Sequence, residues 1–205
     1  MIKAIVFDIG GVLLRTEDQS GRQMLEEKYH LPAGGANALV FDSEPSRLSS
    51  IGKAPQTAIW QNVAQQLDLT PEEQESFRKA FWSGDLLDQE LVTFLKSCRP
   101  TYKTALLSNA WEGSREHFAH NYGFVEGEMV DHVLISAELG VAKPNYRIYD
   151  ILRSTLGFEY AEIIFVDDFL QNIEAAKQLG INAIHFQTGT NVINQIKSIL
   201  VSNTR

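Results

Sequence analysis

Short apolar runs, separated by segments of helical periodicity, constrain the fold more than any other feature of this sequence. Each run is rich in β-forming residues and is bounded by polar residues or glycine, which is typical of buried strands. The runs are Ala4–Phe7, Thr104–Leu107, His132–Ile135, Ile163–Val166 and Ala183–Phe186. Strands that alternate with helices predict a parallel sheet that is covered by helices on both faces.

Helical patterns fill the segments between these runs. Gln89–Cys98 and Tyr146–Leu156 each bring apolar side chains to one helix face. Ile173–Leu179 is followed by Gly180, and a glycine just past the last helical residue is a common C-cap. We therefore predict an α/β fold with a Rossmann-like parallel sheet.

The stretch from Thr16 to Leu86 interrupts this alternation, because it contains helical patterns and no convincing strand. Thr70, with Glu73 three residues later, predicts a capping box at the start of one of these helices. An insertion after the first strand of an open α/β sheet lies over the carboxyl ends of the strands, where ligands bind. We therefore predict a helical cap domain at residues 16–86 and a core domain built from residues 1–15 and 87–205.

Charge and cysteine content exclude several classes of protein. A net charge of −8 over 205 residues argues against a nucleic-acid surface, which needs clustered Lys and Arg. Cys98 is the only cysteine, so the chain has no internal disulfide and suits a reducing, cytoplasmic compartment. No apolar run approaches the roughly 20 residues that span a bilayer. We expect a cytoplasmic monomer or homodimer with no membrane or nucleic-acid partner.

Polar residues stand where three of the predicted strands end, and one more polar block lies between the second and third of these strands. In a parallel sheet the carboxyl ends of the strands can converge on one edge, so these residues can form one compact site. They are Asp8, Gly10 and Gly11; Ser108 and Asn109; Lys143 before Pro144; and Asp167 and Asp168 with Asn172 one helical turn later.

These four blocks resemble the four motifs of the haloacid dehalogenase (HAD) superfamily, in the same order and at suitable spacing. The helical insertion is similar to the helical (C1-type) cap of subfamily I in that superfamily. The resemblance implies a five-stranded Rossmann-like core with strand order 5-4-1-2-3. It also implies a hydrolase that attacks a phosphate ester with the carboxylate of Asp8 and forms an aspartyl-phosphate.

The resemblance implies a Mg²⁺ cofactor held by Asp8, the backbone carbonyl of Gly10 and Asp168. Clustered carboxylates raise one another's pKa unless a cation lies between them, and Mg²⁺ prefers such hard oxygen ligands. Asp167 stands beside this set, either as a further contributor to the metal site or as the cap of the next helix.

The remaining motif residues are expected to bind the substrate. Ser108, placed at the start of a helix, would hold a phosphoryl oxygen, and Asn109 and Gly11 would lie beside it. The ammonium of Lys143 would hold both the Asp8 carboxylate and a phosphoryl oxygen. Taken alone, Ser108 would be a helix cap and Lys143 a solvated surface charge.

Gly10 departs from the family pattern, because phosphatases of this family usually carry a second aspartate there as general acid and base. A positioned proton donor is worth about 10²–10⁴ in rate. Three explanations compete. Another proton source or a good leaving group replaces the aspartate; the chain is a 2-haloacid dehalogenase; or it is a catalytically degenerate protein that binds a ligand or a partner.

The adjacent acids Asp167 and Asp168 disfavour the dehalogenase, since without a metal they would repel an anionic substrate. We expect a Mg²⁺-dependent phosphatase of small phosphorylated metabolites, such as a sugar phosphate. Other candidates have plainer interpretations. His117 and His120 have no third metal ligand, and Arg47 and Lys53 are surface charges. An aromatic set is expected to form the core of the cap: Trp60, Phe77, Phe81 and Trp82.

Overall fold

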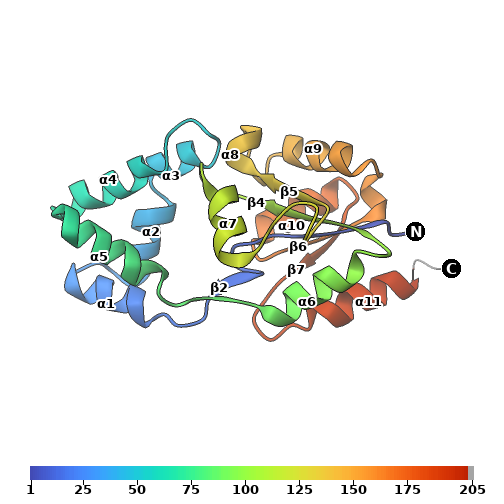
Figure 1. Ribbon diagram of the computed structural model, residues 1–205, viewed down its shortest axis with the longest axis horizontal. Coiled ribbons are helices and arrows are strands. Elements are labelled where there is room, and N and C mark those ends of the chain that lie inside the picture. Colours follow the sequence, from blue (N-terminus) through green and yellow to red (C-terminus); the bar gives the residue numbers. More distant parts are fainter. Residues whose placement is uncertain (203–205) are drawn as a thin grey trace.

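The computed structural model describes residues 1–202 and has two lobes, an α/β core and a smaller helical lobe (Figure 1). The N-terminus and the last described helix, α11 (Val192–Ser202), lie on the side of the core that faces away from the helical lobe. Within the described part of the chain, no helix combines the length and the apolar character that crossing a membrane requires.

A five-stranded parallel sheet forms the centre of the core, with β1 (Ala4–Phe7) in the middle. The strand order is β5-β4-β1-β6-β7. Counted along the chain within this sheet alone and read from the β7 edge, the order is 5-4-1-2-3, as predicted. The other strands are β4 (Lys103–Ser108), β5 (His132–Ile135), β6 (Ile163–Asp167) and β7 (Asn182–His185).

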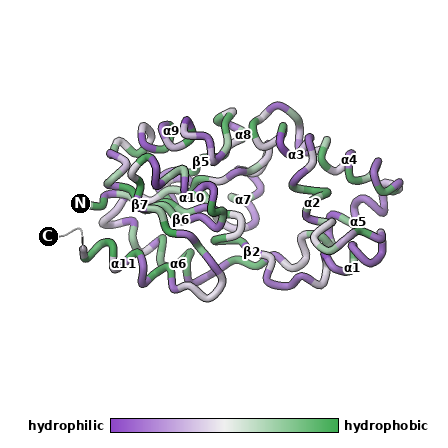
Figure 2. The backbone as a smooth tube through the Cα atoms, turned by 180° about the vertical axis from the view of Figure 1, so that it is seen from behind, coloured by the Kyte–Doolittle hydropathy of each residue, from purple (hydrophilic) through white to green (hydrophobic). Residues whose placement is uncertain are grey.

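Helices cover both faces of the sheet, because alternate residues of β1 point to opposite sides. Ile5 and Phe7 pack with α6 (Gln89–Cys98) and α11 (Val192–Ser202), whereas Ala4 and Val6 pack with α9 (Tyr146–Leu156) and α10 (Leu170–Gln178). Strands β1 and β6 are completely buried between these helical layers, and the hydropathy colouring shows hydrophobic stretches within the sheet (Figure 2). The two-faced burial expected for a parallel sheet is confirmed.

The helices of the core follow the sequence patterns closely. Helices α6 and α9 have the predicted bounds, and α10 begins three residues earlier than Ile173. Three further short elements connect the strands: α7 (Ser114–Tyr122), α8 (Ser136–Leu139) and the 3₁₀ turn η1 (Tyr160–Glu162).

Five helices form the second lobe and enclose an apolar centre of their own. The predicted capping box is present: the Thr70 hydroxyl accepts a hydrogen bond from Glu73 N, and the Glu73 carboxylate accepts one from Thr70 N. Trp60, Phe77 and Phe81 are buried in this centre, as expected for core residues. The helices are α1 (Ser20–Lys28), α2 (Gly35–Phe41), α3 (Glu44–Ser49), α4 (Thr57–Leu67) and α5 (Pro71–Trp82).

A two-stranded antiparallel ribbon joins the lobes, and it corrects the prediction of no strand between Thr16 and Leu86. Its strands are β2 (Leu14–Thr16) and β3 (Asp85–Leu87). The strands cross both predicted boundaries between core and cap, and the division at those residues stays a prediction. The Asp85 carboxylate secures the ribbon, since it accepts a hydrogen bond from Thr16 Oγ1 (2.6 Å) and pairs with Arg22 (3.2 Å).

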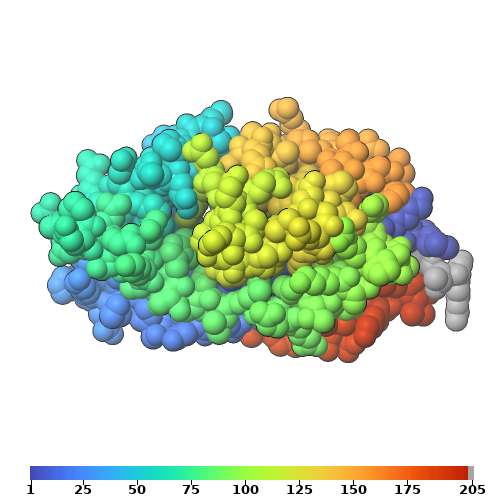
Figure 3. Space-filling model, viewed as in Figure 1, coloured from blue at the N-terminus to red at the C-terminus, as the bar shows by residue number. Residues whose placement is uncertain are grey.

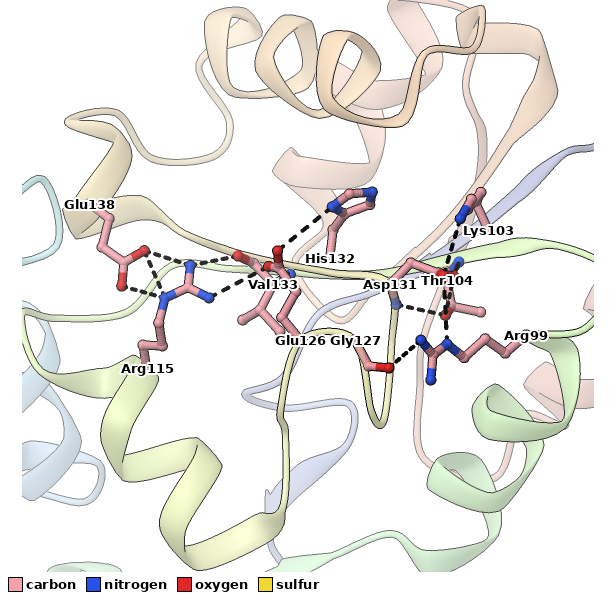
Figure 4. Close-up of polar contacts among 10 residues, drawn as sticks. All are labelled: Arg99, Lys103, Thr104, Arg115, Glu126, Gly127, Asp131, His132, Val133 and Glu138. Carbon is pink, nitrogen blue, oxygen red and sulfur yellow. Dashed lines mark hydrogen bonds and ion pairs between the residues drawn. The ribbon is translucent and has the colours of Figure 1, made fainter.

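Edge strand β5 is held in place by two groups of polar contacts (Figure 4). At its start, Asp131 Oδ2 accepts hydrogen bonds from Thr104 N (2.9 Å) and Thr104 Oγ1 (3.1 Å). At its end, Arg115 of α7 donates to Glu138 of α8 and to the Val133 carbonyl oxygen. The first group ties the start of β5 to the start of β4, and the second ties β5 and α8 to α7.

Candidate active site

The predicted site residues meet where the carboxyl ends of β1, β4 and β6 lie side by side. Phe7 is in register with Leu106 on one side and Val166 on the other. Asp8 and Asp167 follow directly after this level, and Ser108 lies one residue further along, at the end of β4. Asp8, Ser108 and Asp167 are buried, with exposed fractions of 6%, 2% and 0%.

The turn after β1 fixes the carboxylate of Asp8. Asp8 N donates to the Val166 carbonyl oxygen (2.8 Å), and Asp8 Oδ1 accepts a hydrogen bond from Ile9 N (2.7 Å). Gly11 has φ +76°, a conformation that glycine adopts without steric cost. A β-carbon at Gly11 would come within 2.1 Å of Asp168 Oδ2, so the absence of a side chain there makes room for that carboxylate.

Gly10, by contrast, is exposed and has open space beside it. A β-carbon built on Gly10 would meet no atom within 4 Å. The space in which the missing second aspartate would stand is therefore open in this protein.

Lys143 lies under the site with its ammonium group completely bonded. Its Nζ contacts Asp8 Oδ2 (2.9 Å), Asp167 Oδ2 (2.6 Å) and the Leu107 carbonyl oxygen (2.8 Å). An ammonium has three hydrogens, and these three acceptors use all of them. The expected contact between Lys143 and Asp8 is present. A contact with a phosphoryl oxygen would require one of the other bonds to be exchanged.

Asn109 is bonded to the backbone of Lys143. Asn109 Nδ2 donates to the Lys143 carbonyl oxygen (2.9 Å), and Asn109 Oδ1 accepts from Lys143 N (2.8 Å). This double contact positions the lysine. Ser136 also bonds to the backbone of a neighbouring connection, and it was not identified from the sequence. Its hydroxyl accepts a hydrogen bond from Ala110 N (3.0 Å) and donates one to the Ala110 carbonyl oxygen (3.2 Å). A lone serine after a strand carries no signal for this role.

Asp167 has protein partners at both carboxylate oxygens. Oδ1 accepts hydrogen bonds from Phe169 N (2.8 Å) and Asn172 Nδ2 (2.9 Å), and Oδ2 accepts from Lys143 Nζ. Asp167 thus orders the start of α10 and holds Lys143 in place. Asn172, one helical turn further along the chain, contacts both oxygens.

Three carboxylates gathered around one ammonium leave the site with excess negative charge. Burial, reinforced by Asp167, raises the pKa of Asp8 to about 8 and that of Asp168 to about 6. Burial alone would lower the pKa of Lys143, but Asp8 and Asp167 more than offset this and raise it. The cluster therefore favours a further cation.

A divalent cation fits this position. Oxygen atoms of Asp8, Asp167 and Asp168 lie within 4.8 Å of one another. Asp168 Oδ1 is buried and has no hydrogen-bond partner in the protein. A buried carboxylate oxygen without a partner is costly, and a hard cation such as Mg²⁺ would satisfy it. Among the described residues, His117 and His120 belong to no comparable group.

Ser108 does not lie at a helix start, and that expectation was wrong. Helix α7 begins at Ser114, preceded by Gly113 in a left-handed conformation. The residues between form an extended connection, because Asn109 and Ala110 are bonded to the neighbouring β5–α9 connection. Ser108 offers only its hydroxyl and backbone to a ligand, without the anion-attracting end of a helix.

The same connection carries Trp111 into the helical lobe. Trp111 is 8% exposed within the apolar cluster of that lobe, and its indole Nε1 donates to Ser46 Oγ of α3 (3.0 Å). A second contact lies nearby, where a β-carbon at Gly52 would come within 2.3 Å of the Ala137 carbonyl oxygen. The helical lobe thus touches the core next to the site, and the space-filling view shows the two lobes in close contact (Figure 3).

The surface charges Arg47 and Lys53 are exposed, as expected. Arg47 donates to the Asp42 carbonyl oxygen within the helical lobe. Lys53 follows Gly52, so its backbone lies beside the contact between the lobes.

A parallel sheet with three acids at its carboxyl edge and a helical lobe against that edge defines a capped α/β enzyme of the metal-dependent hydrolase type. A family model described as haloacid dehalogenase-like hydrolase matches residues 2–180, and the chain belongs to this family of hydrolases.

Similar proteins cover nearly the whole chain. A D-ribitol-5-phosphate phosphatase of Bacteroides thetaiotaomicron is 27% identical over 98% of this chain and 100% of its own length. A predicted HAD-like hydrolase of Porphyromonas gingivalis has a TM-score of 0.77 at 23% identity, covering 98% of both chains. A Bacteroides thetaiotaomicron HAD family enzyme, solved in complex with magnesium and inorganic phosphate, has a TM-score of 0.75 at 19% identity, covering 93% of this chain and 97% of that one.

Proposed function

We propose that this protein is a Mg²⁺-dependent phosphatase of small phosphorylated metabolites such as sugar phosphates. The observation that carries the proposal is the unpartnered, buried Asp168 Oδ1 beside Asp8, in a cluster of three carboxylates with one lysine. Such a cluster binds a divalent cation, and a cation there attracts a phosphate group. The relationship to a D-ribitol-5-phosphate phosphatase supports the same class of substrate.

In the proposed reaction the Asp8 carboxylate attacks phosphorus. A bond forms between an Asp8 oxygen and phosphorus, the bond from phosphorus to the leaving oxygen breaks, and the electron pair departs with that oxygen. Water then attacks the phosphorus of the aspartyl-phosphate, which releases inorganic phosphate and restores Asp8. Bound Mg²⁺ would supply positive charge that balances the phosphoryl oxygens.

The other residues of the site prepare Asp8 for this attack. Lys143 neutralises part of its charge, and Asp167 and Asn109 hold Lys143 in position. Ser108 and the backbone around Gly11 are proposed to contact the phosphoryl oxygens. Asp8, the Gly10 carbonyl and Asp168 are proposed to bind the metal, with Asp167 alongside. The free, buried Cys98 agrees with the cytoplasm as the proposed location.

A non-catalytic binding protein is the main alternative, since Gly10 stands where phosphatases of the family usually carry the general acid and base. The completely bonded Lys143 and the oriented Asp8 favour catalysis, because a binding site alone needs no buried nucleophile aimed by a lysine. A 2-haloacid dehalogenase is disfavoured by the same three carboxylates, which without a cation would repel a haloacid.

A substrate panel separates these functions. Purified protein should release phosphate from at least one small phosphate ester with Mg²⁺ and lose this activity in EDTA. The Asp8→Asn variant should be inactive at every Mg²⁺ concentration while keeping the melting temperature of a folded protein. Equal turnover by the Asn variant would refute the assignment of the nucleophile, and halide release from a 2-haloacid in EDTA would identify a dehalogenase.

A further inference from the structure

The acids beside Asp8 are unsuited to giving a proton to a leaving group. Asp167 accepts hydrogen bonds at both oxygens, including one from Lys143 Nζ, so both oxygens are already engaged within the protein. Asp168 has the unpartnered oxygen that faces the proposed metal position. That assignment engages Asp168 with the metal and gives it no separate role at the leaving group.

The acids of the ribbon that leads out of the nucleophile turn also have partners. Asp85 pairs with Arg22 and accepts from Thr16 Oγ1, and Asp88 pairs with Arg15 and accepts from Leu91 N (2.8 Å). The two remaining acids at this end of the ribbon are bonded as well, Glu17 to Arg15 and Asp18 to Ser20 N. Each of these carboxylates is thus engaged as an acceptor by a partner within the protein.

The other titratable groups next to the site give their hydrogens to backbone or carboxylate acceptors. Lys143 uses all three, as described above. The Tyr149 hydroxyl donates to the Asn172 carbonyl oxygen (2.8 Å). His185 Nε2 lies 2.9 Å from the Asp168 carbonyl oxygen, so a hydrogen on that nitrogen points to the backbone.

Gly10 completes this pattern, because it lies two residues beyond the nucleophile, is exposed, and has only open space where a side chain would begin. From this arrangement we infer that the enzyme supplies no proton to the leaving group and acts on phosphates whose leaving oxygen departs as a stable anion. Acyl phosphates are the metabolites with this chemistry in its strongest form. The inference rests on the proposed phosphatase function and narrows its substrates to such phosphates, which excludes simple alkyl esters such as phosphates of ordinary sugar hydroxyls.

The first step is then complete without an acid. Asp8 forms a bond to phosphorus while the bond from phosphorus to the acyl oxygen breaks, and the electron pair leaves on a carboxylate that is stable at neutral pH. An alkyl phosphate would have to expel an alkoxide, which is a far stronger base. A missing general acid costs about 10²–10⁴ in rate when the leaving group needs the proton.

The experiment measures kcat/KM, with Mg²⁺, for acetyl phosphate, a series of substituted phenyl phosphates and an alkyl phosphate. This parameter reports events up to departure of the leaving group, whatever the rate of aspartyl-phosphate hydrolysis. The wild-type protein should show kcat/KM falling steeply as the leaving group becomes more basic. The Gly10→Asp variant introduces an acid into the open space, and Gly10→Asn is its matched control without a proton to give.

The quantity compared is the ratio of kcat/KM for the aryl ester to kcat/KM for the alkyl ester. We expect Gly10→Asp to reduce this ratio by about 10²–10⁴, because the acid helps the alkyl ester most. Gly10→Asn should leave the ratio within a few-fold of wild type. Both values in the ratio are measured on the same variant, so a change in its folding or metal affinity affects both values equally and cancels. A wild-type kcat/KM that is independent of leaving-group basicity would overturn the inference and leave the phosphatase intact, as would equal effects of Asp and Asn. No Mg²⁺-dependent turnover of any substrate would instead overturn the phosphatase assignment, and the inference with it.

Discussion

Gly11 lies directly against the carboxylate of Asp168, at a distance that admits no side chain. A β-carbon on Gly11 would come within 2.1 Å of Asp168 Oδ2 and 2.3 Å of its Cγ. The two residues belong to different strand ends, so the turn after β1 determines where the last acid of the site can stand. Gly11 therefore shapes the proposed metal site although it is not itself a metal ligand.

Gly11→Ala should therefore weaken Mg²⁺ binding by displacing Asp168. We expect a loss of about 10–100-fold or more in affinity, the range found when groups that orient metal ligands are removed. The positive φ of Gly11 adds about 1–2 kcal/mol of strain for alanine. Isothermal titration with Mg²⁺ measures the effect. Gly10→Ala is the matched control, because its β-carbon has open space; equal losses in both variants would contradict the role assigned to Gly11.

Asn109→Ala should disorder the backbone that carries Lys143. Both hydrogen bonds of the amide to Lys143 would be lost, and leaving these backbone groups without partners costs about 1–3 kcal/mol. We expect a lower free energy of unfolding and a decrease in kcat that exceeds any change in KM. Denaturant titration and steady-state kinetics test this. If substrate affinity alone fell while stability stayed unchanged, Asn109 would be a substrate-binding residue, as first expected from the sequence.

The stabilisation by Mg²⁺ should grow as the pH rises. The pKa of Asp168 is raised to about 6 and that of Asp8 to about 8, from an ordinary value of 3.8. The folded state thus holds protons that the unfolded chain has released, so the contribution of these groups to stability falls as the pH rises from about 4 to about 8. Mg²⁺ replaces the protons. The increase in melting temperature with Mg²⁺ should be larger at pH 8 than at pH 5, and an increase independent of pH would argue that the ion binds elsewhere.

Trp111→Ala should loosen the contact between the lobes. Trp111 fills the apolar centre of the helical lobe from the core side, and truncating a buried tryptophan typically costs about 3–5 kcal/mol. We expect faster hydrogen exchange in α3 and in the turn that contains Gly52, with little change in the five-stranded sheet. Trp111→Phe keeps an aromatic ring in the cluster but loses part of the indole volume and the bond to Ser46 Oγ, so it should have a smaller effect than alanine. Uniform destabilisation of both lobes would argue against a local contact.

The sequence predicts the sheet well because its strands are buried on both faces. Continuous apolar runs identify β1, β4, β5, β6 and β7, and residues such as Ala4 and Ile5 are fully buried on opposite faces of the sheet. The polar residues at the strand ends could be located for the same reason, since each follows a recognisable run. Asp8, Ser108 and Asp167 meet as expected.

Other features depend on tertiary contacts that have no local pattern. Strands β2 and β3 are three residues each, and the whole helical lobe separates them in the sequence. Neither is long enough to show the alternating hydrophobic pattern of a strand. The role of Asn109 follows from its distance to Lys143, which lies in another connection. Trp111 belongs to the core by sequence and to the helical lobe by packing.

The ribbon of β2 and β3 carries the chain both into the helical lobe and out of it, through two strands that lie side by side. The chain thus leaves the core and returns to it at one place, so the helical lobe is inserted without interrupting any strand of the five-stranded sheet. Besides this ribbon, the lobes meet at Trp111 and at Gly52, so a change in the helical lobe that preserves these two contacts need not disturb the sheet.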